Sequence, residues 1–118
     1  MHEMSIAMNI IELASKAART EGAGHIKDIE LEIGTMAGVF IESLEFCFEA
    51  ASRSTLAEGA TLTIHVIPAK GRCTDCNKIS DVTSLTSQCP HCGAYLLSLS
   101  LISGKDMKIK AITINEER

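Results

Sequence analysis

Four of the five cysteines stand in two closely spaced pairs, a spacing that suits a metal ion. They are Cys73, Cys76, Cys89 and Cys92, in the pattern C-x2-C-x12-C-x2-C. Each pair can form a tight turn, a knuckle, that points two thiolates at one ion, and two knuckles supply a closed tetrahedral set typical of Zn²⁺. Such a set leaves no position open for water or substrate. The spacing therefore predicts a structural zinc site, with disulfides or an iron site as the alternatives.

The residues within and after each knuckle suit tight turns. In the second knuckle, CPHCG, Pro90 fixes a turn dihedral, and Gly93 tolerates the positive φ that often follows such a turn. Asn77 has the equivalent place after the first knuckle and also tolerates a positive φ. We expect the side chain of His91, inside the second knuckle, to point outward.

The start of the chain, MHE, is a second candidate metal site. The Met1 amine, the His2 backbone nitrogen once deprotonated, and the His2 imidazole can close fused chelate rings on one ion. The amide or the carboxylate of Glu3, or a histidine from elsewhere, can supply the fourth donor. Nitrogen-rich tetragonal coordination favours Ni(II) or Cu(II) over zinc. Taken alone, a histidine at position 2 means little, because chain ends are frayed by default.

The bulk composition excludes several classes of protein. A chain of 118 residues makes one domain with room for a small insertion. A net charge of −4 and 3% aromatic residues argue against nucleic-acid binding, which needs cationic and stacking side chains. No apolar run approaches the roughly 20 residues that span a membrane. Without signal-peptide features, the sequence predicts a cytoplasmic protein whose cysteines stay reduced. No nucleophile and base are recognisably paired, so we predict no enzyme.

The rest of the sequence predicts the elements that position these residues. Helical periodicity covers residues 5–20 and 41–54, while apolar and polar residues alternate over 25–34, 60–67 and 107–114. This order predicts an α+β fold with a small three-stranded sheet packed by two helices. Residues 69–104, polar and rich in Cys, Ser and Thr, are interpreted as an inserted zinc-ribbon-like domain. Because the apolar parity changes within the last strand, we expect a β-bulge near Lys110-Ala111.

Several other residues invite a functional interpretation that we do not favour. Cys47, Met4 and Met8 are expected in the core rather than as metal ligands. His25 and His65 are expected to be ordinary exposed residues.

An acidic face is predicted on the strand that includes Asp28, Glu30 and Glu32. This face can dock a partner, but a solvated face is the favoured interpretation because antiparallel sheets often leave one side open to water.

Four segments together resemble a known family: MHEMSIA, LEIGTMAGV, SLEFCFEAASRSTLAEGATL and the cysteine module, in this order. The sequence is similar to the HypA/HybF family of nickel metallochaperones over nearly its whole length. The resemblance implies a nickel-binding α/β domain, residues 1–68 plus 105–118, and a zinc-binding domain, residues 69–104. It implies His2 as a nickel ligand, with Met1 and Glu3 as co-donors, and the four paired cysteines as zinc ligands.

The resemblance also implies a function and partners. Ni²⁺ is the transferred cargo and Zn²⁺ the structural ion. The cargo goes to the large-subunit precursor of a [NiFe]-hydrogenase, with the GTPase HypB as partner; some members also serve urease. Neither nucleic acid nor membrane is an expected partner, and the chain is a monomer or a homodimer. The alternative function is a zinc-ribbon protein-interaction module with no nickel role.

Overall fold

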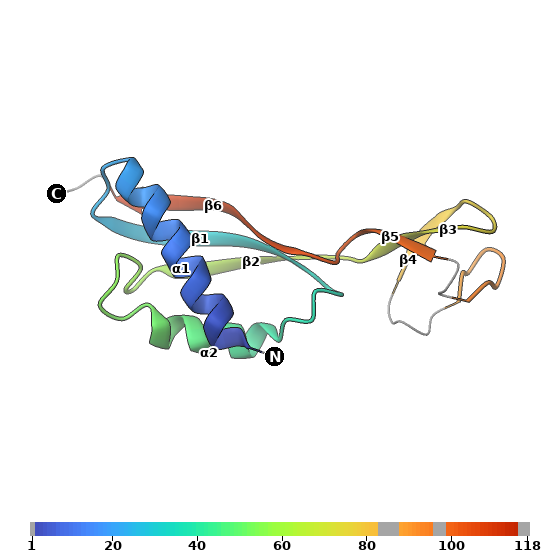
Figure 1. The fold of residues 1–118 in the computed structure, drawn as a ribbon, viewed down its shortest axis with the longest axis horizontal. Coiled ribbons are helices and arrows are strands. Elements are labelled where there is room, and N and C mark those ends of the chain that lie inside the picture. The colour runs from blue at the N-terminus through green and yellow to red at the C-terminus, as the bar shows by residue number, and fades with distance from the viewer. Residues whose placement is uncertain (1, 83–87, 96–98, 116–118) are drawn as a thin grey trace. The chain divides into compact units, whose positions relative to one another are not determined.

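The computed structural model describes residues 2–82, 88–95 and 99–115. The elements, drawn in Figure 1, are α1 (Glu3–Thr20), β1 (His25–Gly34), α2 (Ile41–Ala51), β2 (Thr61–Ile67), β3 (Lys70–Cys73), β4 (Ile79–Asp81), β5 (Leu99–Ser103) and β6 (Met107–Asn115). One three-stranded sheet has the order β2-β1-β6 and the other β4-β3-β5. Two helices with these sheets confirm the predicted α+β class. None of the helices described is long and apolar enough to cross a membrane.

The chain divides into two compact units. We call Met1–Leu31, Val39–His65 and Lys108–Arg118 the helical unit, and Glu32–Gly38 with Val66–Met107 the cysteine unit. The domain boundaries expected from the sequence, at residues 68 and 104, stay a prediction about which segments fold independently.

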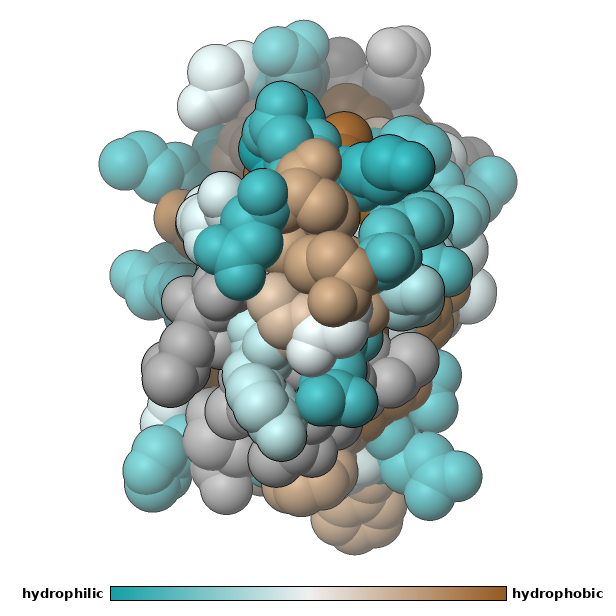
Figure 2. Space-filling model, turned by 90° about the vertical axis from the view of Figure 1, so that its right-hand side faces the viewer, coloured by the Kyte–Doolittle hydropathy of each residue, from teal (hydrophilic) through white to brown (hydrophobic). Residues whose placement is uncertain are grey.

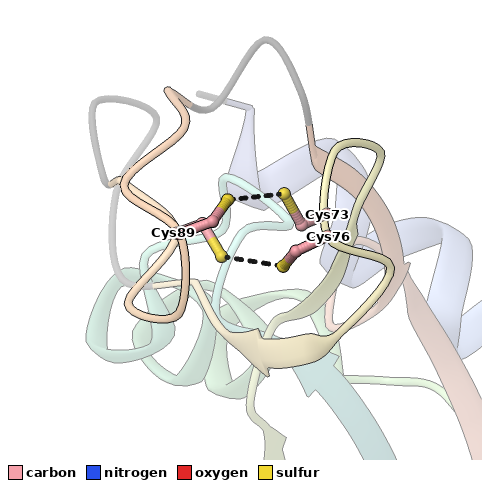
Figure 3. Close-up of side chains that lie close together, drawn as sticks. Cys73, Cys76 and Cys89 are labelled. Atoms are coloured by element: carbon pink, nitrogen blue, oxygen red, sulfur yellow. Dashed lines mark hydrogen bonds between the residues drawn. The ribbon is translucent and has the colours of Figure 1, made fainter.

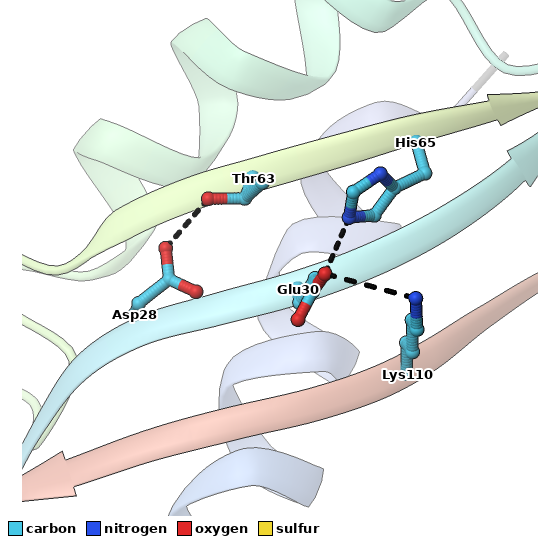
Figure 4. A network of polar contacts seen from close by, with 5 residues as sticks. All are labelled: Asp28, Glu30, Thr63, His65 and Lys110. Carbon is cyan, nitrogen blue, oxygen red and sulfur yellow. Dashed lines mark hydrogen bonds and ion pairs between the residues drawn. The ribbon is translucent and has the colours of Figure 1, made fainter.

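The central strand β1 has the predicted alternation. Ile29, Leu31 and Ile33 are buried, whereas the residues between them are partly exposed. The helices α1 and α2 contact each other and lie on one side of this sheet, as the view from its opposite face shows (Figure 4). The apolar face of β1 therefore forms the core with the helices, and neither of the helices that the structure describes lies on its polar face (Figure 4).

Helix α1 buries a face of mostly small residues, among them Ala7, Ala14 and Ala18. The expectation that Met4 and Met8 lie in the core is wrong, because their exposed fractions are 42% and 58%. Small side chains let the helix axis approach its neighbours closely. The apolar stripe of α1 is wider than the part of the helix that its neighbours cover. Met4 and Met8 lie at the exposed edge of this stripe.

Helix α2 is shorter than predicted, since it ends at Ala51. Leu44 and Phe48 are its buried anchors. Cys47, expected in the core, is only half-buried, because it lies at the edge of the buried face and not on its centre line.

The exposure pattern of β6 changes phase where the sequence suggests an irregularity. Lys110 and Ala111 are both exposed, so alternation along the strand is shifted by one residue from there on. This pattern is what a bulge produces. The bulge itself stays a prediction.

Three short strands, which the sequence analysis did not predict, organise the cysteine unit. Strand β3 pairs antiparallel with β4 and β5, with Gly71 opposite Ser80 on one side and Leu101 on the other. Figure 2 shows one face of the molecule, on which a narrow strip of apolar side chains lies among mostly hydrophilic ones. The strands hold the first cysteine, at the end of β3, in place.

Within the cysteine unit, backbone segments cross at very short range. A Cβ atom added to Gly34 would lie 2.0 Å from the carbonyl oxygen of Gly104, and one added to Gly104 would lie 2.4 Å from the Cα of Ala69. Hydrogen bonds fix this crossing: the Met36 N–H donates to the Gly104 carbonyl, and the Ala69 N–H donates to the Thr35 hydroxyl. The crossing leaves no room for side chains at either glycine.

Candidate metal centre

The four paired cysteines come together as their spacing predicted. Their Sγ atoms all lie within 4.8 Å of one another, and the thiols of the two knuckles face each other in Figure 3. The Sγ atoms of Cys73 and Cys92 are 3.6 Å apart, as are those of Cys76 and Cys89. A tetrahedral zinc site with Zn–S bonds of 2.3 Å has sulfurs about 3.8 Å apart, whereas a disulfide has them at about 2.05 Å. The arrangement fits one tetrahedral ion and no disulfide.

The two knuckles have the same backbone geometry. In the first, the Asn77 N–H donates to the Cys73 carbonyl at 2.7 Å, and in the second the Gly93 N–H donates to the Cys89 carbonyl at 2.8 Å. Asn77 and Gly93 both have a positive φ, 64° and 80°. The prediction that these two positions need residues tolerant of positive φ is confirmed.

Backbone N–H groups point at the sulfur atoms and tune their charge. The Cys89 thiol is the clearest case: burial raises its pKa, but hydrogen bonds from the backbone of His91 and Cys92 outweigh this and bring the pKa down to about 7. The His91 nitrogen lies 3.4 Å from the Cys89 sulfur. One sulfur of the metal-free cluster is thus prepared to carry negative charge near neutral pH.

Other thiols of the cluster hold their protons more tightly. A backbone hydrogen bond from Ala94 lowers the pKa of Cys92, but the Cys73 thiol, burial and the remaining thiols raise it to about 12. For Cys76, the backbone of Lys78 lowers the pKa, but burial and the thiols of Cys89 and Cys73 raise it above its usual value. Crowded sulfurs cannot all ionise without a cation, so the donor set has the chemistry of a site that exchanges protons for a metal ion.

The cluster is shielded unevenly. Cys73 and Cys89 are buried, Cys76 is half-buried and Cys92 is exposed. An ion held by all four sulfurs would have no open coordination position and would join the two knuckles as a structural staple. Arg72 turns its guanidinium toward the Asn77 carbonyl, 3.5 Å away, and so contacts the first knuckle through its backbone.

At the other candidate site, His2 is exposed and lies directly before α1. Its carbonyl accepts the Ile6 N–H, the first hydrogen bond of the helix. Glu3 is buried, with 5% of its surface exposed, and its Oε2 accepts a hydrogen bond from the Phe40 N–H at 3.1 Å. The sequence pattern did not indicate this contact, which spans 37 positions. Met1 lies outside the described residues.

The remaining histidines have separate places and do not join either site. His91 is exposed, as expected. The His25 ring nitrogen Nε2 lies 2.8 Å from the Glu58 carbonyl, and this side chain is half-buried rather than exposed. His65, on the polar face of the sheet, pairs through Nε2 with Glu30, as Figure 4 shows.

Acidic side chains of β1 pair with side chains of the two neighbouring strands, β2 and β6. Glu30 lies between His65 on β2 and Lys110 on β6, with its carboxylate 3.9 Å from the lysine Nζ (Figure 4). Asp28 accepts a hydrogen bond from the Thr63 hydroxyl at 2.7 Å. Such cross-strand pairs stabilise the sheet, and both the solvated face and the docking role stay predictions.

Comparisons with known proteins cover almost the whole chain. The family model "Hydrogenase/urease nickel incorporation, metallochaperone, hypA" matches residues 1–114. Hydrogenase maturation factor HypA of Chlorobium limicola is 47% identical over 98% of each chain, and that of Chlorobaculum tepidum is 46% identical over 97% of this chain and 99% of the relative. HypA of Parabacteroides distasonis is 41% identical over 99% of this chain and all of the relative.

Solved structures show the same fold. The solution structure of the Ni metallochaperone HypA from Helicobacter pylori has a TM-score of 0.68 at 21% identity, covering 99% of this chain and all of that one. A second HypA solution structure has a TM-score of 0.72 at 22% identity, covering 99% and 98%. The matching fold, the gathered cysteines and the family match along residues 1–114 lead to one conclusion: the chain belongs to the HypA family of nickel metallochaperones.

Proposed function

We propose that this protein binds Ni(II) at its N-terminus and delivers it during maturation of a [NiFe]-hydrogenase, acting as a carrier and not as an enzyme. The observation that carries the proposal is that His2 is exposed and lies immediately before α1. It is distant in the sequence from the cysteine cluster and is not one of the residues that form it. The family description, nickel incorporation into hydrogenase or urease, supports nickel as the cargo.

The nitrogen donors of the proposed site follow from the start of the helix. The Met1 amine, the His2 amide and the His2 imidazole form the chelate. The Glu3 amide is favoured as the fourth donor, because the first N–H groups of a helix have no partner within it. The Glu3 carboxylate is a poorer candidate, since it is buried and accepts the Phe40 N–H.

The proposed nickel site would let its ion dissociate, whereas the cysteine cluster would bind its ion permanently. Few ligands at an exposed terminus let Ni(II) leave toward an acceptor. We propose that Cys73, Cys76, Cys89 and Cys92 hold Zn²⁺ as a permanent staple of a domain formed by residues 69–104, while residues 1–68 and 105–118 form the nickel-binding domain. The proposed partners are the GTPase HypB and the hydrogenase large-subunit precursor, in the cytoplasm.

The test is a nickel titration of the untagged, zinc-loaded protein followed by equilibrium dialysis. The wild type should bind nickel, and both His2→Ala and a version extended by Gly-Ser ahead of Met1 should lose it while keeping zinc. His91→Ala is the matched control, because it removes an exposed imidazole elsewhere and should leave nickel binding unchanged. Nickel retained by both altered proteins would refute the terminal site.

The same titration separates the alternative function. A zinc-ribbon interaction module with no nickel role predicts one bound zinc and no nickel in the wild type. Acidification provides a second check, since the imidazole and amine must lose protons to bind nickel. Nickel affinity should fall between pH 7.5 and pH 6, around the usual histidine pKa of about 6.5.

A further inference from the structure

The outer face of α2 has an apolar side chain that packing does not explain. Phe46 is 76% exposed, although Leu44 and Phe48 on the same helix are buried. Side chains three and four residues apart are neighbours on a helix, so Glu42 and Glu49 flank Phe46. An aromatic ring held in water on a regular helix has an unfavourable hydration that a binding partner would relieve.

All charged side chains of α2 are negative. Glu42, Glu45 and Glu49 are exposed, and α2 contains no Lys or Arg. Glu49 pairs with Arg53 at 2.9 Å, one turn beyond it. Glu42 and Glu45 make no ion pair with any residue that the structure describes.

A groove of about 570 Å³ runs beside this face in the helical unit. The residues that line it include two apolar ones, Phe48 and Leu62, and four charged ones, of which three are acidic and one is basic: Glu45, Glu49, Glu58 and Arg53. One Glu58 oxygen accepts the Ser54 N–H, and this hydrogen bond holds the Glu58 side chain in place. The residues that line the groove therefore combine apolar surface with a net negative charge.

We propose that Phe46, the three glutamates of α2 and the adjoining groove form a docking surface for a basic, amphipathic segment of a partner protein. An apolar side chain of that segment would cover Phe46, and its Lys or Arg side chains would reach into the groove toward Glu45 and Glu49. Charge complementarity selects this occupant. The proposal is independent of nickel binding, because none of these residues belongs to the proposed nickel site.

The charges disfavour other occupants. A second copy of the chain docked through the same face would bring two sets of three glutamates together, which opposes association. An anionic lipid surface would be repelled for the same reason. A cationic protein segment is the occupant that gains from both the ring and the carboxylates.

The test uses the full-length, zinc-loaded protein labelled with ¹⁵N and a synthetic helical peptide with Leu at helical spacing and Lys and Arg on the flanks. Saturable amide shifts should map to α2 and to residues 58–62. Phe46→Ser and Glu45→Lys should each weaken binding about tenfold, equivalent to about 1.4 kcal/mol. A peptide with Glu in place of Lys and Arg should not bind.

Matched controls on α1 remove general charge and hydrophobicity as explanations. Glu12→Lys changes the same charge on an exposed helix, and Leu13→Ser removes an apolar side chain that is 51% exposed. Both should leave the peptide affinity within about twofold, well under the tenfold that 1.4 kcal/mol represents. No saturable shifts on α2, or equal losses in the α1 controls, would overturn the proposal. Amide shifts on α2 that depend on the concentration of the protein alone, without peptide, would indicate self-association through this face and would also overturn the proposal.

Discussion

The Glu3 carboxylate accepts a hydrogen bond from the Phe40 N–H, 3.1 Å away, and so joins the first turn of α1 to the start of α2. Phe40 is the residue that precedes α2, and it has no side chain able to cap the helix. An acidic group from another helix takes over part of this task, where negative charge is favoured by the helix dipole. The residue next to the proposed nickel ligand is therefore a packing residue of the helical unit.

Replacing Glu3 by Ala should destabilise the fold by about 1–3 kcal/mol, because the Phe40 N–H loses a partly buried hydrogen bond to the buried Glu3 side chain. Glu3→Gln should cost less, since its amide oxygen can still accept the Phe40 N–H. Urea unfolding of the zinc-loaded protein measures both values. Glu12→Ala, an exposed change on the same helix, should alter stability very little. Equal stability of Glu3→Ala and wild type would show that the contact does not form in solution.

Gly104→Ala should destabilise the protein more than Gly59→Ala. The two glycines have nearly the same positive φ, 78° and 80°, so the backbone strain of an added side chain is matched. At Gly59 the new Cβ meets nothing within 4 Å, whereas at Gly104 it meets the Ala69 backbone at 2.4 Å. Overpacking of this kind adds about 1–3 kcal/mol. Thermal unfolding compares them, and identical melting temperatures would contradict the observed crossing.

The equivalence of the knuckles predicts which substitutions they accept. Gly93→Asn should retain zinc affinity, because the first knuckle already uses Asn77 at this position with a positive φ. Gly93→Val should weaken zinc binding about tenfold, since a β-branched residue costs about 1–2 kcal/mol in this conformation. Competition with a chromophoric chelator gives both affinities. Equal affinities for the Asn and Val variants would be incompatible with this geometry.

Zinc affinity should fall on acidification, and more steeply below about pH 7. Because the pKa values of Cys76 and Cys92 are raised, the proposed zinc ion would have to displace protons from these thiols throughout the neutral range. Cys89, with a pKa of about 7, is mostly ionised above that pH and protonated below it. Binding below pH 7 must therefore release about one additional proton.

Chelator competition between pH 6 and pH 8, with calorimetry in buffers of different ionisation enthalpy, counts the released protons. Cys47→Ser is the control, since this cysteine is not in the cluster and its loss should leave the proton count unchanged. A constant number of released protons across this range would contradict the assigned pKa of Cys89.

Local patterns in the sequence predicted the features that depend on residues close together along the chain. The cysteine pairs, with Asn77 and Gly93 directly after them, define the two knuckles, and alternation along β1 defines its buried face. Turn geometry and strand periodicity are local properties, so they can be seen without knowing the fold.

Features that depend on distant contacts were missed or misjudged. The partner of Glu3 is 37 positions away, and no pattern in MHEMS indicates it. Met8 matches an apolar helical stripe but is exposed, because the width of the buried face is set by what packs against α1. The short strands β3, β4 and β5 lack periodicity long enough to detect, and pairing between them holds them in place.

The close backbone contacts among Gly34, Gly104 and Ala69 limit which segments of this protein can be exchanged with those of a relative. Gly104 closely approaches Gly34, and its own missing Cβ faces the backbone of Ala69, so neither glycine has room for a side chain. A segment transplanted from a relative to replace residues 69–104 would need a glycine at position 104, and the recipient would need one at position 34. A chimera would have to keep the backbone at these three positions as it is here.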